Sequence, residues 1–583
     1  MSSAASDRLI PAGIISRVQS RARSIVLVLL LTSFLATPRL LGINRFATID
    51  EPYWLTAGSD FYYALGQRDF AGTVYDYHPA VITMWIVTAA MLLYFPQYRG
   101  LGQGYFDVYK ESLESFLLAH GRAPLGLLTI ARLIQTALIV VLLLAVFWFL
   151  KKLLGGKAAA VGTVLVSLDP FFLGHSRLLN HEGLMSLLVV VSLLSLLTYS
   201  LADGKWSYLV ASGAAAGMAQ LAKSSSAVLF PVVGILFILD WWKGRRANLR
   251  RDFVLTLSRL GAWAGTLVLL YVLLWPGMWV APGKMLSEVF GNAFSYATEG
   301  ARLSAVTPGA SASIQPSLGD IGLYVQSVLW RTTPVVWLGA VLGLVSLFRQ
   351  NRIERVVLLS LISVGGLFIL LFGLANGRNS AHYVLTSYVV LDILAGVGFA
   401  AAAGWLEGRR SKLRSVVLPG LVLGGAIVAQ AASAAQFFPY YYTYYNPIME
   451  AREPGLQDPN FGYGEGLDLA AAYLRQMPGA ADSAVMAFYG RGPFSYFYPG
   501  KTEPLKPVYA DAENVPQLQE SLRRSDYLVI YYALEKGRDS PSNVMRALQT
   551  VVPDKSIWLD GIEYVRIYSL RKMPSGFIDQ LSP

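Results

Sequence analysis

The chain contains no cysteine among its 583 residues, which excludes disulfide bonds and thiolate metal sites. Charged residues are scarce as well: they make up 15% of the chain, whereas 54% of its residues are hydrophobic and the mean hydropathy is +0.46. A soluble protein of this length needs a more polar surface than these residues can provide. The composition therefore predicts a polytopic α-helical membrane protein.

The net charge of +11 would suggest nucleic-acid binding in a soluble chain. Here the basic residues cluster in short connections between apolar segments, which is the positive-inside pattern of membrane proteins. We therefore expect membrane lipids and no nucleic acid as partners, a multi-pass protein of the plasma membrane, and a cytoplasmic N-terminus. The clusters are Arg17 to Arg23, Lys151 to Lys157, Lys243 to Arg251, Arg349 to Arg355 and Arg409 to Arg414.

Eleven apolar segments are long enough to be predicted as membrane spans. An odd number of spans places the C-terminus opposite the N-terminus, outside the cytoplasm. Residues 80–95 are apolar over only about sixteen positions, so we predict a short interfacial or re-entrant helix there. The predicted spans are residues 23–41, 129–150, 158–174, 183–201, 206–222, 225–242, 254–275, 321–348, 355–375, 382–403 and 415–437.

These spans define a transmembrane domain over residues 1–438, with an external loop at 42–128 and a second one at 275–320. The second loop is rich in Gly, Ser and Pro, which favours a mobile or substrate-shaping loop. From residue 439 to 583 the composition is that of a water-soluble protein, and we predict an extracytoplasmic α/β domain. Its expected strands are 483–489, 526–532 and 563–570, and its expected helices are 467–477, 515–524 and 542–551.

Two adjacent carboxylates, Asp50 and Glu51, follow the first predicted span by only a few residues. An ionised side chain beside a bilayer is costly unless it is solvated, paired or used, so this pair is a candidate catalytic site. A solvated loop end is the alternative interpretation. Further polar residues gather where other spans end on the same side, and the candidate cavity residues are Tyr53, Tyr77, His78, Asp169, His175, Asn180, Glu182 and Tyr383.

Cations are also found at this face. Phosphate groups in proteins are bound by the paired N–H donors of Arg or by the ammonium group of Lys, so these side chains are candidates for phosphate binding. Contact with lipid headgroups is the alternative for each of them. His181 and Glu182 could also hold a divalent metal ion, and the sequence leaves that requirement open. The four predicted phosphate-binding residues are Arg177, Lys223, Arg378 and His382.

Together these motifs resemble the protein O-mannosyltransferase family and the related bacterial lipid A aminoarabinose transferases. The resemblance rests on Asp50-Glu51, on His78-Pro79 before a short helix, on the stretch from Asp169 to Glu182 and on Lys223. It extends to the junction from Tyr440 to Pro447 and to Gly462 through Asp468, which is similar to bacterial members.

The resemblance implies a glycosyltransferase of the GT-C type, similar to hexosyl- or mannosyltransferases. It implies a polyprenyl-phosphate-linked sugar donor and inversion at the anomeric carbon. Asp50 would be the general base, and Glu51 would shape the site or contact the acceptor. The four cations would hold the leaving phosphate. The acceptor is left open between a protein hydroxyl, a glycolipid and a polysaccharide.

Two other functions remain open from the sequence. A secondary transporter also places charged residues near broken helices, although usually at mid-membrane. A cell-envelope scaffold without transferase activity would use the external domain to bind polymer. The candidates here lie at one face, which favours an enzyme.

Overall fold

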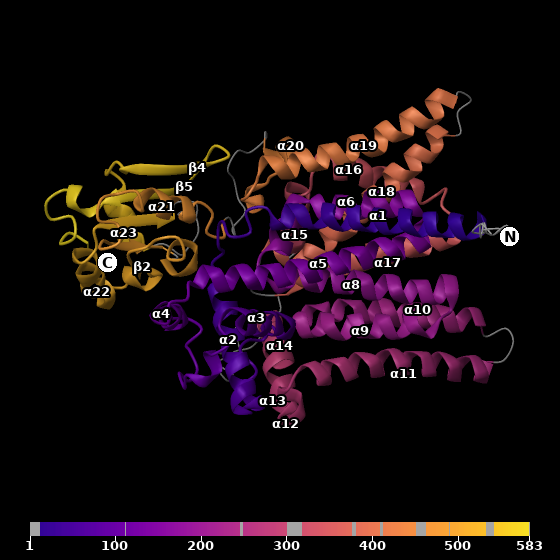
Figure 1. Ribbon diagram of the computed structural model, residues 1–583, viewed down its shortest axis with the longest axis horizontal. Coiled ribbons are helices and arrows are strands. Elements are labelled where there is room, and N and C mark those ends of the chain that lie inside the picture. Colours follow the sequence, from indigo (N-terminus) through magenta and orange to yellow (C-terminus); the bar gives the residue numbers. More distant parts are fainter. Residues whose placement is uncertain are drawn as a thin grey trace, which may run out of the picture.

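A computed structural model of the protein describes residues 12–110, 112–244, 249–299, 318–375, 380–407, 412–450, 462–488, 490–531 and 541–581. The chain forms a long bundle of helices with a small α/β domain at one end (Figure 1). Helix α1 (Ala12–Leu40) begins at the opposite end of the bundle from that domain (Figure 1). The predicted fold class, a polytopic α-helical protein with a C-terminal α/β domain, is confirmed.

The bundle helices coincide with the predicted apolar segments. Their bounds are α1 (Ala12–Leu40), α5 (Pro124–Leu154), α6 (Gly156–Leu168), α7 (Pro170–Arg177), α8 (His181–Thr198), α9 (Trp206–Ala222), α10 (Leu229–Gly244), α11 (Leu249–Leu274), α15 (Leu318–Arg331), α16 (Pro334–Ser346), α17 (Arg352–Leu374), α18 (Leu385–Glu407) and α19 (Lys412–Gln436).

The described helices support fewer membrane spans than the sequence predicts. Seven helices within the described residues are long and apolar enough to cross a membrane, or up to nine if each bent pair is one span. The bent pairs are α6 with α7, at 68°, and α15 with α16, at 113°. The described apolar part of α1 (Ile25–Leu40) is short, and α9 does not meet the criterion. The predicted count of eleven is therefore not confirmed.

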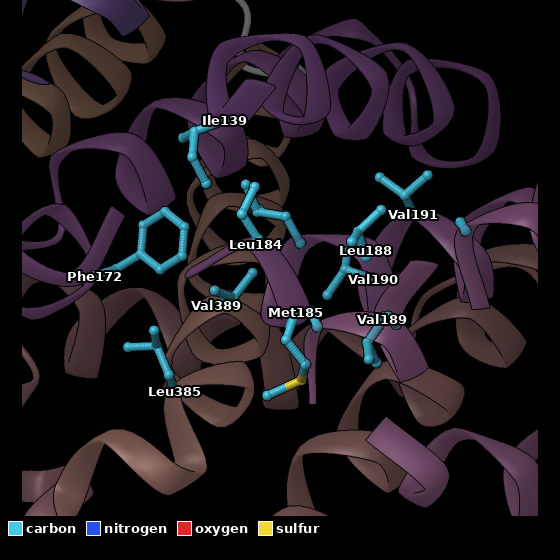
Figure 2. Close-up of a cluster of buried hydrophobic side chains, with 14 of the residues drawn as sticks. Ile139, Phe172, Leu184, Met185, Leu188, Val189, Val190, Val191, Leu385 and Val389 are labelled. Carbon is cyan, nitrogen blue, oxygen red and sulfur yellow. The ribbon is translucent and has the colours of Figure 1, made fainter. Parts of the chain in front are cut away.

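Helix α8 lies at the centre of the bundle and is buried along its whole length. A helix that is apolar on all sides needs neighbours on all sides, and α8 packs against α5, α9 and α18. Figure 2 shows part of this core, where Leu184 and Met185 of α8 meet Phe172 of α7 and Val389 of α18. The core therefore fixes the start of α8, where His181 and Glu182 are found.

Helices α6 and α18 approach each other closely through glycine. A Cβ atom on Gly396 would lie 2.3 Å from the Cα atom of Gly162, closer than any real contact. Small residues let helices in a membrane pack backbone to backbone, and dispersion contacts then hold them together. This contact makes α6 and α18 a rigid pair beside α8.

The predicted first external loop forms three helices beyond the bundle: α2 (Glu51–Gln67), α3 (Val81–Tyr94) and α4 (Ser112–Ala119). Helix α3 has 14 residues, as expected for the short apolar segment. These helices lie at the end of the bundle that carries the α/β domain (Figure 1).

The second external loop contains short helices that the sequence did not predict. These are α12 (Gly277–Val280), α13 (Pro282–Leu286) and α14 (Asn292–Glu299), while residues 300–317 lie outside the described part. The indole nitrogen of Trp275 donates to the carbonyl of Thr73 (3.0 Å), and Lys284 Nζ donates to that of Ala71 (2.9 Å). The second loop is thus attached to the first.

The C-terminal domain is built on a five-stranded sheet in the order β2-β1-β3-β5-β4. Strand β1 pairs in parallel with β2 and β3, whereas β5 runs antiparallel to β3 and β4. The elements of the domain are β1 (Ala484–Ala487), β2 (Lys501–Pro504), β3 (Tyr527–Tyr531), β4 (Lys555–Leu559) and β5 (Ile562–Ser569), with helices α20 (Pro447–Glu450), α21 (Leu467–Leu474), α22 (Val515–Arg523) and α23 (Ser542–Leu548).

All three predicted strands and all three predicted helices of this domain are present, and β2 and β4 were missed. The domain has its own hydrophobic core, which includes Leu474, Val485, Leu528 and Ile567. Such a core is typical of a unit that holds its shape beside the membrane helices.

Candidate functional site

Asp50 stands at the start of α2, at the junction between the bundle and the external helices. It is the N-cap residue by backbone position, but its side chain does not cap the helix. Pro52, in the first turn, lacks an N–H group and so needs no cap at that position. Asp50 is half-buried. Its carboxylate is therefore not used in capping α2.

Glu51, by contrast, is fully buried and held on both carboxylate oxygens. Arg132 of α5 donates from Nε to Oε1 (2.8 Å) and from Nη2 to Oε2 (2.5 Å). The backbone N–H groups of Thr48 and Leu179 donate to Oε2 and Oε1, each at 2.8 Å. Both side chains of the ion pair have no exposed surface.

The same guanidinium also holds the chain ahead of α2. Arg132 donates to the carbonyls of Ile43 (2.5 Å) and Phe46 (2.9 Å). The Glu51–Arg132 clamp thus joins the segment after α1, the start of α2, α5 and the turn before α8. We therefore expect Glu51 to hold these segments in place, and its predicted contact with the acceptor stays a prediction.

A second cluster lies at the start of α8 and the end of α9, around Glu182 in the first turn of α8. Lys223, at the C-cap of α9, donates from Nζ to Glu182 Oε1. His181 Nε2 lies 3.6 Å and His382 Nε2 lies 3.9 Å from the same oxygen. The Lys223 ammonium also lies 4.3 Å from the centre of the Tyr383 ring. The sequence predicted these residues separately, and the fold brings them together.

Tyr463 connects this cluster to the segment that carries Asp50. Its carbonyl accepts a hydrogen bond from the Ile49 N–H (3.1 Å), and its hydroxyl lies 2.5 Å from His382 Nδ1. Ser380 Oγ is 2.6 Å from the same ring nitrogen. Sequence reasoning missed Tyr463, although it lies between Gly462 and Gly464, whose φ angles of 98° and 106° favour glycine.

The aromatic candidates line the side of the site formed by α2 and the turn before α3. The His78 ring lies 5.2 Å from that of His181, and Trp54 packs edge-on against His181 at 4.9 Å. Tyr53 donates to the carbonyl of Tyr75 (3.0 Å). Helices α2 and α8 therefore meet at His181, one residue before Glu182.

Tyr77 connects the same turn to the second external loop. Its ring centre lies 4.6 Å from that of Tyr296 in α14. The second loop therefore closes over the turn before α3.

Of three other candidates, two cap helices and the third is buried inside α7. Asp169 caps α7 by accepting from the Phe172 N–H (2.7 Å), and Asn180 caps α8 by accepting from the Glu182 N–H (2.6 Å). His175 is buried, with its Nδ1 atom 3.3 Å from the Tyr442 hydroxyl. We expect these three residues to support the site rather than to contact substrate.

Arg177, a predicted phosphate-binding residue, is engaged by backbone carbonyls, and its predicted role stays a prediction. It is 1% exposed, and its Nη2 atom donates to the carbonyls of Leu41 and Gly42, each at 2.7 Å. These bonds fasten the end of α1 to α7. Arg378, the remaining predicted phosphate ligand, lies outside the described residues.

Arg331 is a buried cation that sequence reasoning missed. It donates to the carbonyl of Tyr442, to the carbonyl of Tyr444 (3.2 Å) and to the Tyr445 hydroxyl (2.8 Å). The guanidinium also lies 4.0 Å from the centre of the Tyr445 ring. It fixes the tyrosine-rich junction between α19 and the C-terminal domain.

Asp60 lies further along α2, nearly three turns from Asp50 and outside the candidate spans. It is buried and accepts a hydrogen bond from the Phe106 N–H (3.0 Å). Burial raises the pKa of Asp60 to about 7, although the hydrogen bond from Phe106 acts in the opposite direction.

The described part of the chain contains no set of side chains placed to bind a metal ion. No group of three or more His, Asp or Glu side chains there is placed to hold a metal ion. His181 and Glu182 were the residues that the sequence suggested for a metal. In the structure Glu182 forms an ion pair with Lys223, and His181 lies near the same carboxylate oxygen.

Part of the membrane region is similar to a known family. Residues 127–275 match the model of the dolichyl-phosphate-mannose-protein mannosyltransferase family. A comparison with curated protein sequences gives no match. The predicted resemblance to membrane glycosyltransferases is confirmed by this family match, which covers α5 to α11 and includes Arg132, Glu182 and Lys223.

Three solved structures are similar to this chain at low sequence identity. ArnT from Cupriavidus metallidurans, bound to undecaprenyl phosphate, is 12% identical with a TM-score of 0.49, over 93% of this chain and 97% of that one. The oligosaccharyltransferase AglB from Archaeoglobus fulgidus, with an inhibitory peptide and a dolichol-phosphate, is 11% identical with a TM-score of 0.46, over 91% and 71%. The Pmt1-Pmt2 complex of S. cerevisiae, bound to its sugar donor, is 18% identical with a TM-score of 0.36, over 45% and 34%.

Proposed function

We propose that the protein is an inverting glycosyltransferase that moves a sugar from a polyprenyl-phosphate donor to an acceptor hydroxyl on the extracytoplasmic side of the membrane. The observation that carries this proposal is the contrast between two adjacent acids at the head of α2. Glu51 is buried in a clamp, whereas Asp50 is half-buried and does not cap its helix. Tyr463 joins this segment to the cluster of Lys223 and His382. The family match over residues 127–275 supports sugar transfer as the reaction.

In the proposed reaction Asp50 accepts the proton of the acceptor hydroxyl as that oxygen attacks C1 of the sugar. A positioned general base typically contributes about 10²- to 10⁴-fold to the rate. The new bond from oxygen to C1 forms as the bond from C1 to the phosphate oxygen breaks. The electron pair of that bond leaves with the polyprenyl phosphate, and the configuration at C1 inverts.

The leaving phosphate is assigned to the cluster around Glu182. Lys223 supplies the cation, and both Lys223 and His382 lie next to Glu182. A fixed cation stabilises charge that develops on the phosphate oxygen in the transition state. Glu182 holds the lysine in place through their ion pair, which has 1% and 2% of its side-chain surface exposed.

The orientation in the membrane follows from the charge distribution. Lys151 and Lys152 lie in the last turn of α5, at the end of the bundle where α1 starts (Figure 1). We place this end in the cytoplasm, in line with the positive-inside rule. The site and the C-terminal domain, which we assign to residues 439–583, then face outward with the transmembrane domain (residues 1–438) behind them. A protein, a glycolipid or a polysaccharide could approach from that side as acceptor.

The test is transfer of radiolabelled sugar from synthetic polyprenyl-phosphate donors by the purified protein. Asp50→Asn is expected to lower transfer by about 10²- to 10⁴-fold, with donor binding retained. Asp107→Asn is the matched control, because it makes the same change at an exposed residue of the same loop. A chelator arm tests for a divalent ion.

Transfer at the wild-type rate by Asp50→Asn would remove Asp50 from the mechanism. If the wild-type protein transfers sugar from no donor, while proteoliposomes that contain it take up substrate, the transporter reading replaces this proposal.

A further inference from the structure

The C-terminal domain touches the membrane region at the start of α2, next to Asp50. The contact is made by the turn from Gly490 to Phe494, which follows β1. Gly492 in this turn has a φ angle of 85°, and a Cβ atom there would lie 2.2 Å from Cγ of Pro52. Only glycine allows the turn to approach α2 this closely. The domain therefore rests directly on the first turn of α2.

Arg491, in the same turn, reaches three parts of the first external loop. Its Nε atom donates to Glu114 Oε1 of α4 (2.9 Å), and its Nη1 atom donates to the carbonyl of Val108 (2.7 Å). Its Nη2 atom donates to Thr56 Oγ1 of α2 (2.7 Å). Thr56 Oγ1 in turn donates to the carbonyl of Pro52 (2.9 Å). One guanidinium thus connects the domain, α4 and the first turn of α2.

This contact is enclosed rather than exposed to solvent. The side chains of Arg491 and Glu114 are 13% and 7% exposed. The Tyr496 hydroxyl also donates to Glu114 Oε1 (3.1 Å). Burial raises the pKa of Glu114, and the nearby charge of Arg491 opposes that shift. A planar guanidinium with several N–H donors can hold such a geometry, and a lysine ammonium cannot reproduce it.

We infer that Arg491 is a positioning residue, through which the C-terminal domain sets the direction of α2 and so the place of Asp50. The inference rests on the proposed function, since it is Asp50 that must meet the acceptor. The Glu51–Arg132 clamp holds the start of α2 from the membrane side, and Arg491 holds it from the domain side. Neither residue touches the reacting atoms.

The kinetic test compares Arg491→Gln with Arg523→Gln, which removes an exposed arginine of the same domain. A displacement of about 1 Å in a catalytic group costs on the order of 10²-fold in rate. We therefore expect kcat of Arg491→Gln to fall by about 10²-fold, with KM for the donor unchanged, because the donor phosphate site lies at Lys223. Arg523→Gln is expected to keep the wild-type kcat. Equal kcat values for the two variants would overturn the inference.

A conservative variant separates positioning from folding. Arg491→Lys keeps the charge opposite Glu114 but cannot donate to Val108 and Thr56 as well. Arg491→Lys is expected to unfold at the temperature of the wild type. Its kcat is still expected to fall at least about tenfold, which is less than the fall expected for Arg491→Gln. Full recovery of kcat in Arg491→Lys would show that the fork of hydrogen bonds is not what positions α2.

Hydrogen exchange supplies a readout that needs no transfer. Peptides that cover residues 50–60 are expected to exchange at least about tenfold faster in Arg491→Gln than in Arg523→Gln, since the α2 amides lose a fixed neighbour. Unchanged exchange in these peptides would refute the positioning role, even if the wild-type protein transfers no sugar. If exchange rises but no donor supports transfer by the wild type, the positioning of α2 stands and the proposed function fails.

Discussion

Replacing Glu51 by glutamine tests whether this acid holds the site together or takes part in the chemistry. Glutamine keeps the shape of the side chain but removes the negative charge opposite Arg132. The carboxylate now accepts four hydrogen bonds, two from the guanidinium and two from backbone N–H groups. A glutamine side chain has one oxygen and an NH₂ group, so one former acceptor position becomes a donor.

The expected loss of stability is large because both partners are fully buried. Breaking a buried pair by removing one member costs about 3–5 kcal/mol, since the remaining charge has no compensation. Removing both charges avoids much of this cost. The double variant Glu51→Gln/Arg132→Gln is therefore expected to be less destabilised than the sum of the two single variants.

The assay is the free energy of unfolding of each purified variant in detergent micelles, measured beside sugar transfer. Glu503→Gln is the control, because its partner Lys501 is 65% exposed. Exposed pairs contribute little, so no resolvable change is expected there. If Glu51→Gln keeps wild-type stability and only loses transfer, the clamp reasoning is refuted and Glu51 belongs to the chemistry. Additive effects of the two single changes would likewise contradict a coupled pair.

Three further predictions follow from the same structure. Lys223→Gln is expected to raise KM for the donor at least about tenfold, because a charge-assisted contact worth roughly 1.5–3 kcal/mol is lost, and an unchanged KM in the transfer assay would disprove the phosphate assignment. The raised pKa of Asp60 means that the folded state binds its proton more tightly, so the wild type loses stability as pH rises from about 4 to about 7. Asp60→Asn should lack that loss in pH-dependent unfolding, and parallel pH profiles would count against it. Gly396→Leu is expected to prevent packing of α6 on α18 and to lower the thermal unfolding temperature, whereas Gly404→Ala, which meets no atom within 4 Å, should not.

Much of the fold is predictable because the membrane imposes a simple rule on the sequence. Spans must be apolar over a fixed length, so the bundle helices and the 14-residue helix α3 can be located from hydropathy alone. Length and composition do not settle whether α9 crosses the membrane, since its apolar character is weak and neighbours enclose it. The bends between α6 and α7 and between α15 and α16 depend on tertiary contacts.

Two strands of the C-terminal domain illustrate different causes of failure. Strand β2 is a polar edge strand that ends at Pro504, and nothing in its four residues indicates a strand. Strand β4 carried a usable signal, because the Asp560-Gly561 turn joins it to β5 with positive φ at both residues. An Asp-Gly pair between alternating segments predicts a hairpin.

The site was predictable in its residue types and not in its pairings. Asp50, Lys223 and His382 stand out in the sequence because charge at a membrane boundary is costly. Tyr463, which lies beside His382 and holds the residue before Asp50, is far away in the chain, and only the fold brings it close. Glu51 and Arg177 are candidates by the same rule. In the structure Glu51 forms a buried ion pair with Arg132, and Arg177 donates to backbone carbonyls.

The contact between Arg491 and Glu114 determines how late during synthesis the first external loop can be completed. The two residues are 377 positions apart, whereas Glu51 and Arg132 are 81 apart. At synthesis rates of 5–20 residues per second, roughly 20 to 75 s pass between the emergence of Glu114 and that of Arg491. If Arg491 positions α2 as we infer, Asp50 reaches its final position only when the chain is nearly complete. On the role inferred for Arg491, a nascent or truncated chain that lacks it is expected to carry Asp50 without holding it in place.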